Sequence, residues 1–388
     1  MELVVTGIFW CIILLIIHAY ILYPVSLRIL ALFKSKQKIE NQEPLPSVSI
    51  LISAYNEGRV IADRIENIKN IDYDFNKIEV IIGSDYSSDN TNEILKQKAQ
   101  EYNWLKIKIF DIRRGKANVL NDLVQVGRNE ILVFTDANTM FEKNALLNLV
   151  SKFSNKKVGG VCGRLELEEP NENFDKTNRE KLYWQYETHL KKMEGELGVL
   201  IAANGGIFAI RKELFTKFPE REAITDDLFQ TFSVLAQGFN FIFSYDAVAK
   251  EYVSKKMITE FRRKVRFAAT NFQTLKFFKV LLFLQNPLIS YALFSHKLIR
   301  WFVPLLLILL LVTSAITKNF GQLYYVIFLA QIFFYASALL GYLFKLSRIN
   351  VAFFSIIYYY VVTNLALLIG LFHFLLKKQA PIWQSTPR

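Results

Sequence analysis

Polar residues that could hold a nucleotide and its metal ion follow short apolar runs in the first half of the chain. They are Tyr55 with Glu57, Asp85, and Asp136 with Asn138, and Lys116 opens a helix-like segment between them. A single acid after a strand commonly only caps the next helix. Several acids and amides at one edge, with a lysine beside them, could instead bind a nucleotide, a divalent cation on its diphosphate and the phosphates themselves.

Two common nucleotide-binding patterns are absent from these segments of the sequence. Gly115-Lys116 lacks the upstream glycine and the following Ser or Thr of a P-loop. The first strand-like run is not followed by G-x-G-x-x-G, so a dinucleotide-binding domain is not expected.

Alternating strand and helix patterns surround these residues. Residues 47–54, 77–83, 105–110 and 130–135 are short β-branched runs, and residues 59–70, 89–101 and 116–127 read as amphipathic helices. Repeated β-α-β units give a mostly parallel, Rossmann-like α/β sheet with helices on both faces. Ligands bind beyond the carboxyl ends of such strands, where the polar residues lie.

Long uncharged runs predict membrane helices on both sides of this domain. Leu3–Leu27 is uncharged and is followed by Arg28, Lys34, Lys36 and Lys38, which places the following residues in the cytosol. Three further runs begin at Trp301, Phe320 and Ile349. We therefore expect an N-terminal transmembrane helix over 1–33 and a cytosolic domain over 34–278. An interfacial helix over 279–297, interrupted at Pro287, and about three transmembrane helices with a short tail over 298–388 would follow.

The charge of the chain is unevenly distributed. Its net charge is +12, yet residues 261–388 hold 14 Lys and Arg and no acid, between apolar runs. This pattern is typical of membrane flanks and argues against a nucleic-acid partner. Three crossings after the domain would leave the tail outside, whereas Lys377 and Lys378 favour the inside, so the side of the tail stays open. Cys11 and Cys162 are too few for a disulfide scaffold.

Five motifs in this order resemble those of family 2 glycosyltransferases with the GT-A fold. Tyr55-Asn56-Glu57, Asp85 and Asp136-Ala137-Asn138 match strand-end motifs, Thr225-Asp226-Asp227 looks like T-E-D, and Arg263 to Phe267 looks like Q-x-x-R-W. The membrane-embedded branch of this family includes the cellulose, chitin, hyaluronan and poly-N-acetylglucosamine synthases. The resemblance covers nearly the whole chain and implies a GT-A domain with transmembrane helices.

The resemblance also implies roles for individual residues. Asp227 would be the catalytic base, and Asp136 with Asn138 would hold Mg²⁺ or Mn²⁺. The donor sugar nucleotide, expected to carry uridine, would be bound by Tyr55, Glu57, Asp85, Lys116, Asp136, Arg263 and Arg266. The acceptor would be contacted by Gly205, Gly206, Asp226 and Phe267. From the residues alone, Thr225-Asp226-Asp227 equally reads as the capped start of a helix over 228–236.

The resulting hypothesis is an inverting, metal-dependent hexosyltransferase in a bacterial-type inner or plasma membrane, with its catalytic domain in the cytosol. It would extend a β-linked polysaccharide from a nucleotide sugar, with a homo-oligomer or an export partner completing a path for processive export. The alternative acceptor is a polyprenyl phosphate or another lipid-linked acceptor. Outside the enzymes, a membrane transporter or sensor, or a non-catalytic subunit, would also fit an α/β domain with membrane helices.

Overall fold

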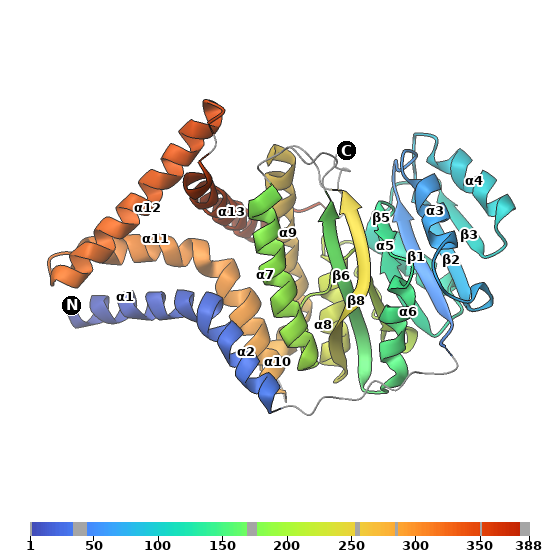
Figure 1. Cartoon of the computed structure of the whole chain (residues 1–388), viewed down its shortest axis with the longest axis horizontal. Helices are drawn as coiled ribbons and strands as arrows, with labels where there is room; N and C mark the ends of the chain where they lie inside the picture. The colour runs from blue at the N-terminus through green and yellow to red at the C-terminus, as the bar shows by residue number, and fades with distance from the viewer. Residues whose placement is uncertain are drawn as a thin grey trace.

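The computed structural model describes residues 2–33, 45–168, 177–252, 257–283, 286–349 and 351–380. Figure 1 shows a sheet with helices on both faces, joined at one side to a group of long helices that extend away from it. The predicted division into an α/β domain and apolar helices is therefore confirmed for the described residues. The linker over 34–44 and the tail from 381 onward lie outside them.

The sheet has eight strands in the order β3-β2-β1-β4-β7-β6-β8-β5. Their bounds are β1 Val48–Ala54, β2 Ile78–Asp85, β3 Leu105–Phe110, β4 Ile131–Thr135, β5 Thr139–Phe141, β6 Val158–Glu168, β7 Phe208–Arg211 and β8 Asn240–Tyr252. The first four strands are parallel, with Ile50 opposite both Val80 and Val133. The predicted parallel half of the sheet is confirmed, because β1, β2 and β4 are buried runs of the kind that parallel sheets require.

The second half of the sheet is mixed. Strand β7 pairs antiparallel with both β4 and β6, β8 runs parallel to β6, and β5 pairs antiparallel with β8. The antiparallel β7 therefore joins the parallel half to the long strands β6 and β8. The expected mostly parallel sheet is thus interrupted by two antiparallel strands, β7 and β5.

Among the described residues, seven helices belong to the α/β domain. They are α3 Ile61–Lys69, α4 Thr91–Glu101, α5 Lys116–Val126, α6 Ala145–Val150, α7 Thr177–Glu196, α8 Asp226–Ala236 and α9 Met257–Phe277. Short 3₁₀ turns lie at Phe75–Lys77, Ser151–Ser154, Lys212–Leu214 and Lys279–Leu282. Helices α3, α4 and α5 fall within one to two residues of the bounds that their patterns predict.

Within the described part of the chain, four apolar helical runs are long enough to cross a bilayer: Glu2–Leu32, Pro287–Thr317, Gln322–Leu346 and Ala352–Leu375. The first joins α1 (Glu2–Ile17) to α2 (Tyr23–Leu32) through a π turn at His18–Leu22. The second joins α10 (Pro287–Ala292) to α11 (Ile299–Thr317) through a π turn at Leu293–Leu298, and α12 (Gln322–Leu346) and α13 (Ala352–Leu375) are the others.

The segment that we expected to be a separate interfacial helix differs in the structure. Its predicted interruption at Pro287 is instead the start of the helix that continues through α11. The Asn286 side chain accepts a hydrogen bond of 3.1 Å from the backbone N–H of Leu288, and Pro287 occupies the first turn. Proline fits there because its missing N–H has no partner to lose.

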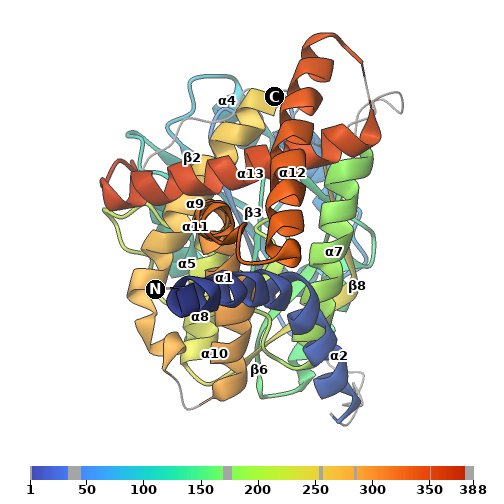
Figure 2. The same cartoon turned by 90° about the vertical axis from the view of Figure 1, so that its left-hand side faces the viewer.

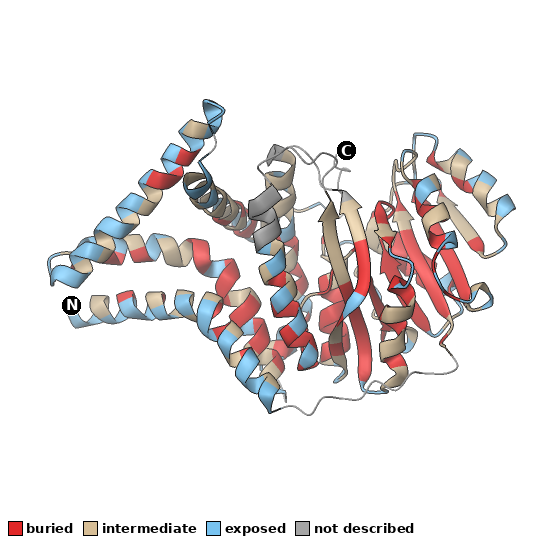
Figure 3. Ribbon diagram, in the orientation of Figure 1, coloured by how far each residue is buried: buried red, intermediate tan, exposed pale blue. Residues whose placement is uncertain are grey.

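One hydrophobic core continues from the sheet into the apolar helices. Phe134 and Phe208 of the sheet stack with ring centroids 4.8 Å apart, and the same cluster of buried residues includes Tyr23, Leu293 and Leu371 from the apolar helices. Figure 3 shows this burial continuing from the sheet into α2 and α10, while α1 and α12 remain largely exposed. A second cluster fills the other face of the sheet under α3 and α6.

A buried polar network crosses the same boundary. The Glu194 carboxylate on α7 accepts hydrogen bonds from Tyr23 Oη at 2.6 Å and lies 2.6 Å from His296 Nδ1. Glu187 lies seven residues earlier on α7. Its carboxylate pairs with Arg300 at 2.6 Å and with His296 at 3.2 Å. The described part of α7 is thus fixed to α2 and to the helix formed by α10 and α11.

Candidate active site

Asp85, at the end of β2, fixes the loop that precedes α5. Its carboxylate accepts hydrogen bonds from the backbone N–H groups of Arg114 at 2.6 Å and Gly115 at 2.9 Å. The Arg113 side chain donates to the same carboxylate at 3.3 Å. Gly115 has a φ of +82°, a conformation that glycine adopts without strain. The loop turns there, so that Lys116 begins α5 at the carboxyl edge of the sheet.

Lys116 connects the two acidic motifs of the site. Its Nζ lies 2.8 Å from Asp136 Oδ1, directly after β4, and 2.9 Å from Asp226 Oδ2, at the start of α8. Burial opposes the charged lysine, but the two carboxylates outweigh it and raise the pKa of Lys116. The ammonium group therefore stays positive between two negative groups that are 90 residues apart in the sequence.

Asp227 faces the glycine turn. A Cβ atom on Gly205 would lie 3.3 Å from Asp227 Oδ2, and Asp227 Oδ1 accepts a hydrogen bond of 2.7 Å from the backbone N–H of Leu228. Burial and the negative charge of Asp226 raise the pKa of Asp227 to about 6, from an ordinary value of 3.8. The carboxylate is therefore ionised at neutral pH yet ready to accept a proton, which suits a general base.

The glycine turn at Gly205 and Gly206 is held from three sides. Asn204 and Ile207 form a bridge across it, and the Asn204 side chain donates to the Gly163 carbonyl at 2.8 Å. Thr135 Oγ1, one residue before Asp136, donates to the Gly206 carbonyl at 2.8 Å. The turn is thus a fixed wall beside Asp227 rather than an open loop.

The basic segment of α9 lies across the site from α5. Arg266 is close enough to Asp226 and Asp136 to feel their charges, while burial and the neighbouring Arg263 lower its pKa to about 10. Phe267 is 41% exposed, and the Arg266 guanidinium lies 5.0 Å from its ring centre. The predicted Q-x-x-R-W-like segment is therefore brought to the same edge as the acidic motifs.

The loop after β1 lies at the other end of this edge. The Arg113 guanidinium stacks over the Tyr55 ring at 3.1 Å, and the Glu57 backbone N–H donates to Thr91 Oγ1 at 2.9 Å. The Glu57 carbonyl accepts from the first turn of α3. Tyr55 is thus linked to Asp85 through Arg113, and the Glu57 backbone lies beside the start of α4.

The Asp136 carboxylate and the Asn138 side-chain oxygen are ligands that suit a hard divalent cation. Asn138 Nδ2 donates to Glu251 at 3.0 Å, whereas Asn138 Oδ1 is buried and accepts no hydrogen bond. Asp136, two residues earlier, supplies a carboxylate. Among the described residues, no three His, Cys, Asp or Glu side chains gather as a complete metal site. The residues present fit an ion such as Mg²⁺ that takes its other ligands from substrate phosphates and water.

Three basic residues near the site escaped the sequence analysis. Arg113 contacts Tyr55 and Asp85, and Lys191 on α7 donates a hydrogen bond to Asn204 at the glycine turn. Arg64 on α3 is fully buried and donates to Thr135 Oγ1 at 3.1 Å. Arg113 adjoins Gly115-Lys116 and could have been noticed there. Arg64 gave no signal, because an arginine on an amphipathic helix normally lies in solvent.

Comparisons with known proteins agree with this geometry. Residues 49–218 match the model of the family described as glycosyl transferase family 2. A beta-monoglucosyldiacylglycerol synthase of Trichormus variabilis is 31% identical over 239 residues, which are 60% of this chain and 51% of that protein. A poly-beta-1,6-N-acetyl-D-glucosamine synthase of Staphylococcus epidermidis is 32% identical over 127 residues, 32% of this chain and 30% of that one. The chain thus spans about half or less of these relatives.

A solved structure supports the fold over nearly the whole chain. A mannosyltransferase from Pyrobaculum calidifontis, in complex with GDP-Man and Mn²⁺, superposes with a TM-score of 0.73. The match covers 96% of this chain and 100% of the other at 21% identity. At this identity the likeness confirms the fold alone, including the arrangement of sheet and apolar helices.

Proposed function

We propose that the chain is a family 2 hexosyltransferase, since residues 49–218 match that family, and that it transfers one sugar from a nucleotide sugar to a membrane lipid. The observation that carries the proposal is the position of Lys116, within 2.9 Å of both Asp136 and Asp226. This contact joins the strand-end motif to the helix that carries Asp227.

The donor would lie along the carboxyl edge of β1, β2 and β4. Tyr55, Glu57 and Asp85 would take the nucleoside end, and Lys116, Arg263 and Arg266 would face the diphosphate. Asp136 and Asn138 Oδ1 would hold Mg²⁺ or Mn²⁺, which when bound neutralises charge on the diphosphate. The three cationic side chains act in the same direction, since they oppose the negative charge that builds up on the leaving group.

Asp227 would be the general base. The acceptor hydroxyl, beside Gly205 and Gly206, loses its proton to the Asp227 carboxylate as its oxygen forms a bond to the anomeric carbon. The bond from that carbon to the diphosphate oxygen breaks on the opposite side, and the electron pair leaves with the nucleoside diphosphate. A single displacement of this kind inverts the anomeric configuration. A pKa of about 6 allows Asp227 to be ionised before the step and to take up the proton during it.

Lipid exposure of the apolar helices favours a lipid acceptor over a growing polysaccharide. The most apolar windows of the four runs bury 17%, 44%, 17% and 11% of their residues inside the chain. Helices that enclose a polymer path would bury a large share of their surface against one another. The exposed surfaces instead suit contact with lipid, with the catalytic domain in the cytosol as the basic residues after Leu27 indicate.

The test is transfer by the purified full-length chain in lipid vesicles. UDP-sugars and GDP-sugars are supplied one at a time with Mg²⁺ or Mn²⁺ and with a lipid extract that contains diacylglycerol and polyprenyl phosphate. We expect one donor to release its nucleotide, one lipid to gain the mass of a single sugar, and chelator to stop both. A polymeric product would refute the lipid acceptor while leaving the transferase reaction intact.

Asp227→Asn provides the test of the base. This variant should bind the donor nucleotide with unchanged affinity and lose turnover, whereas Glu93→Gln, at an exposed carboxylate on α4, should behave as the parent. Full turnover by Asp227→Asn would show that another group accepts the proton.

A further inference from the structure

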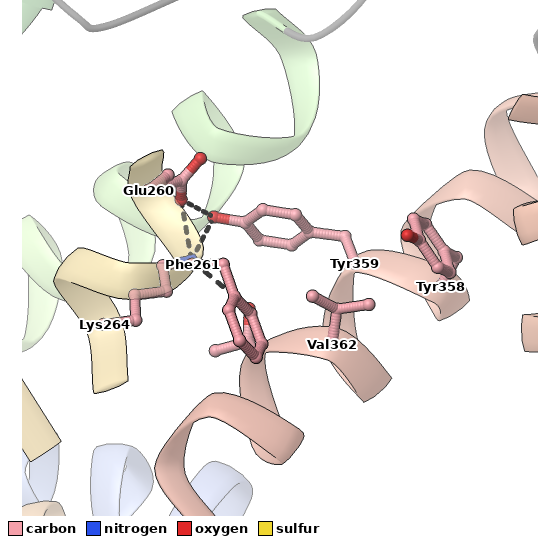
Figure 4. Close-up of a pocket in the computed structure, with 7 residues that line it drawn as sticks. Glu260, Phe261, Lys264, Tyr358, Tyr359 and Val362 are labelled. Atoms are coloured by element: carbon pink, nitrogen blue, oxygen red, sulfur yellow. Dashed lines mark hydrogen bonds and ion pairs between the residues drawn. The ribbon is translucent and has the colours of Figure 1, made fainter. Parts of the chain in front are cut away.

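Helix α13 contacts α9 along most of its length. Near its start, Tyr359 Oη lies 2.6 Å from Lys264 Nζ and 3.1 Å from a Glu260 carboxylate oxygen, as Figure 4 shows. Lys264 also reaches Thr363 Oγ1 at 3.2 Å, one turn further along α13. These contacts fix the first half of α13 to the N-terminal half of α9.

The second half of α13 lies against α9 as well. A Cβ atom on Gly370 would come within 2.4 Å of the Ala268 Cβ, so only glycine allows the two helices to approach this closely. The Phe374 ring stacks on Phe272 with centroids 5.6 Å apart. Just beyond the helix, Gln379 Nε2 lies 3.5 Å from the Ala269 carbonyl. Contacts with α9 therefore run from Tyr359 to Gln379.

Helix α9 cannot lie in the hydrocarbon core. It carries six charged residues between Glu260 and Lys276, and Arg266 lies near the carboxylates of Asp226 and Asp136. The Thr270 Oγ1 atom of α9 lies 2.7 Å from Thr225 Oγ1, and Thr225 directly precedes the helix that carries Asp227. Charged side chains at mid-bilayer are costly and rare. Helix α9 is therefore part of the cytosolic domain surface, at or above the headgroup level.

A spanning α13 is incompatible with these contacts. Sixteen residues separate Tyr359 from the end of α13 at Leu375, and a helix of that length rises about 24 Å, most of the thickness of the hydrocarbon core. If α13 crossed the bilayer, one of its ends would leave α9 by that distance. Figure 2 shows α13 lengthwise and crossing α9, whereas Figure 1 shows it nearly end on while α1 and α11 run across the view. Helix α13 thus runs crosswise to α1 and α11.

We propose that α13 does not cross the membrane but lies in the cytosolic interface, between the bilayer and α9, with its outward face in the lipid of the cytosolic leaflet. That face, opposite the residues that contact α9, includes the exposed apolar side chains of Leu365 and Phe372. Because α13 has the same mean hydropathy as α12, 1.9, its length and composition alone do not distinguish the two placements.

The charges at the helix ends agree with this placement. With three crossings, by α1–α2, α10–α11 and α12, the basic residues Arg28, Arg348 and Lys378 all lie on the cytosolic face. The short turn at Lys318 and Asn319 then lies outside. A fourth crossing would move Lys377 and Lys378 to the outer face, against the positive-inside rule.

Labelling of one introduced, exposed cysteine in the full-length chain in cells tests the proposal without any enzyme assay. Its outcome is therefore independent of the proposed function. The exposed Cys11 is replaced by serine, and the buried Cys162 is retained. Cysteine is then introduced as Asn319→Cys, Ser347→Cys, Lys377→Cys or Lys378→Cys, all at exposed positions. A membrane-impermeant maleimide is added to intact and to permeabilised cells.

We expect Asn319→Cys to react in intact cells, and Ser347→Cys, Lys377→Cys and Lys378→Cys to react at least tenfold more after permeabilisation. The two lysine positions report the same helix end, so a fault in one variant does not decide the result. Reaction of Lys377→Cys and Lys378→Cys in intact cells would place the end of α13 outside the cell. That result would overturn the proposal whether or not Ser347→Cys also reacts in intact cells.

Discussion

The acidity of Asp227 gives the most discriminating prediction, because two neighbours change it in opposite directions. The Asp226 charge raises the pKa of Asp227 and the Lys116 charge lowers it, while burial raises it further. The rise from 3.8 to about 6 is equivalent to about 3 kcal/mol against the ionised form. If Asp227 is the base, kcat/KM should fall about tenfold for each pH unit below about 6.

Neutralising either neighbour should move this acidic limb by a predictable amount. A unit charge close to a carboxyl group changes its pKa by about 1–3 units, and the lower bound, about one unit, is equivalent to about 1.4 kcal/mol. Asp226→Asn should therefore shift the limb about one unit to lower pH, and Lys116→Gln about one unit to higher pH. Both variants will weaken catalysis as well, since Lys116 pairs with Asp226, so the pH of the midpoint and not the maximal rate is the quantity compared.

The assay is nucleotide release at subsaturating donor between pH 4.5 and 8.5, which reports groups of the free enzyme. Glu93→Gln is the matched control, since it removes an exposed carboxylate from α4 without a contact at the site. Shifts in the same direction for Asp226→Asn and Lys116→Gln, or no shift in either, would refute the assignment of the limb to Asp227.

Three further predictions concern single contacts. Asn138→Ala removes the unpaired Oδ1 atom and should raise the Mn²⁺ concentration for half-maximal activity of chelator-treated enzyme about tenfold or more; an unchanged concentration would exclude Asn138 from the metal site. Gly205→Ala places a methyl group 3.3 Å from Asp227 Oδ2 and should lower kcat about tenfold with an unchanged unfolding temperature; a fall in that temperature would indicate a structural role instead. Gly370→Ala brings a methyl group within 2.6 Å of the Val265 carbonyl and should destabilise the chain by about 1–3 kcal/mol in thermal unfolding, whereas Gly7→Ala, with nothing within 4 Å, should not.

The local patterns of the sequence were sufficient for the parallel half of the fold and for the edge where the site lies. Runs such as 47–54 are rich in buried aliphatic residues because both faces of a parallel sheet are buried, and each is followed by polar residues at the carboxyl edge. The placement of Asp85, Lys116 and Asp136 at one edge follows from that rule. The roles assigned to them stay predictions.

Contacts between distant segments were beyond the sequence. Lys116 pairs with Asp226 because the fold brings the starts of α5 and α8 together, and β7 pairs with β4 in a strand order that has no local signal. Arg64 is buried because neutral partners, Asn67, Thr135 and the Phe141 ring, surround it. Pro287 was interpreted as an interruption because a proline within a helix and a proline at its first turn look alike when the start of the helix is unknown.

The core and the polar network shared by α7, α2 and the α10–α11 helix determine how the molecule can come apart. Glu194 and His296 are buried together, and removing the apolar helices would leave Glu187 and Glu194 without their buried partners. The catalytic domain is therefore not a detachable module: it should unfold as one cooperative unit with α2 and α10. Solubilising agents that strip lipid from these helices should consequently inactivate the enzyme by loosening its catalytic core.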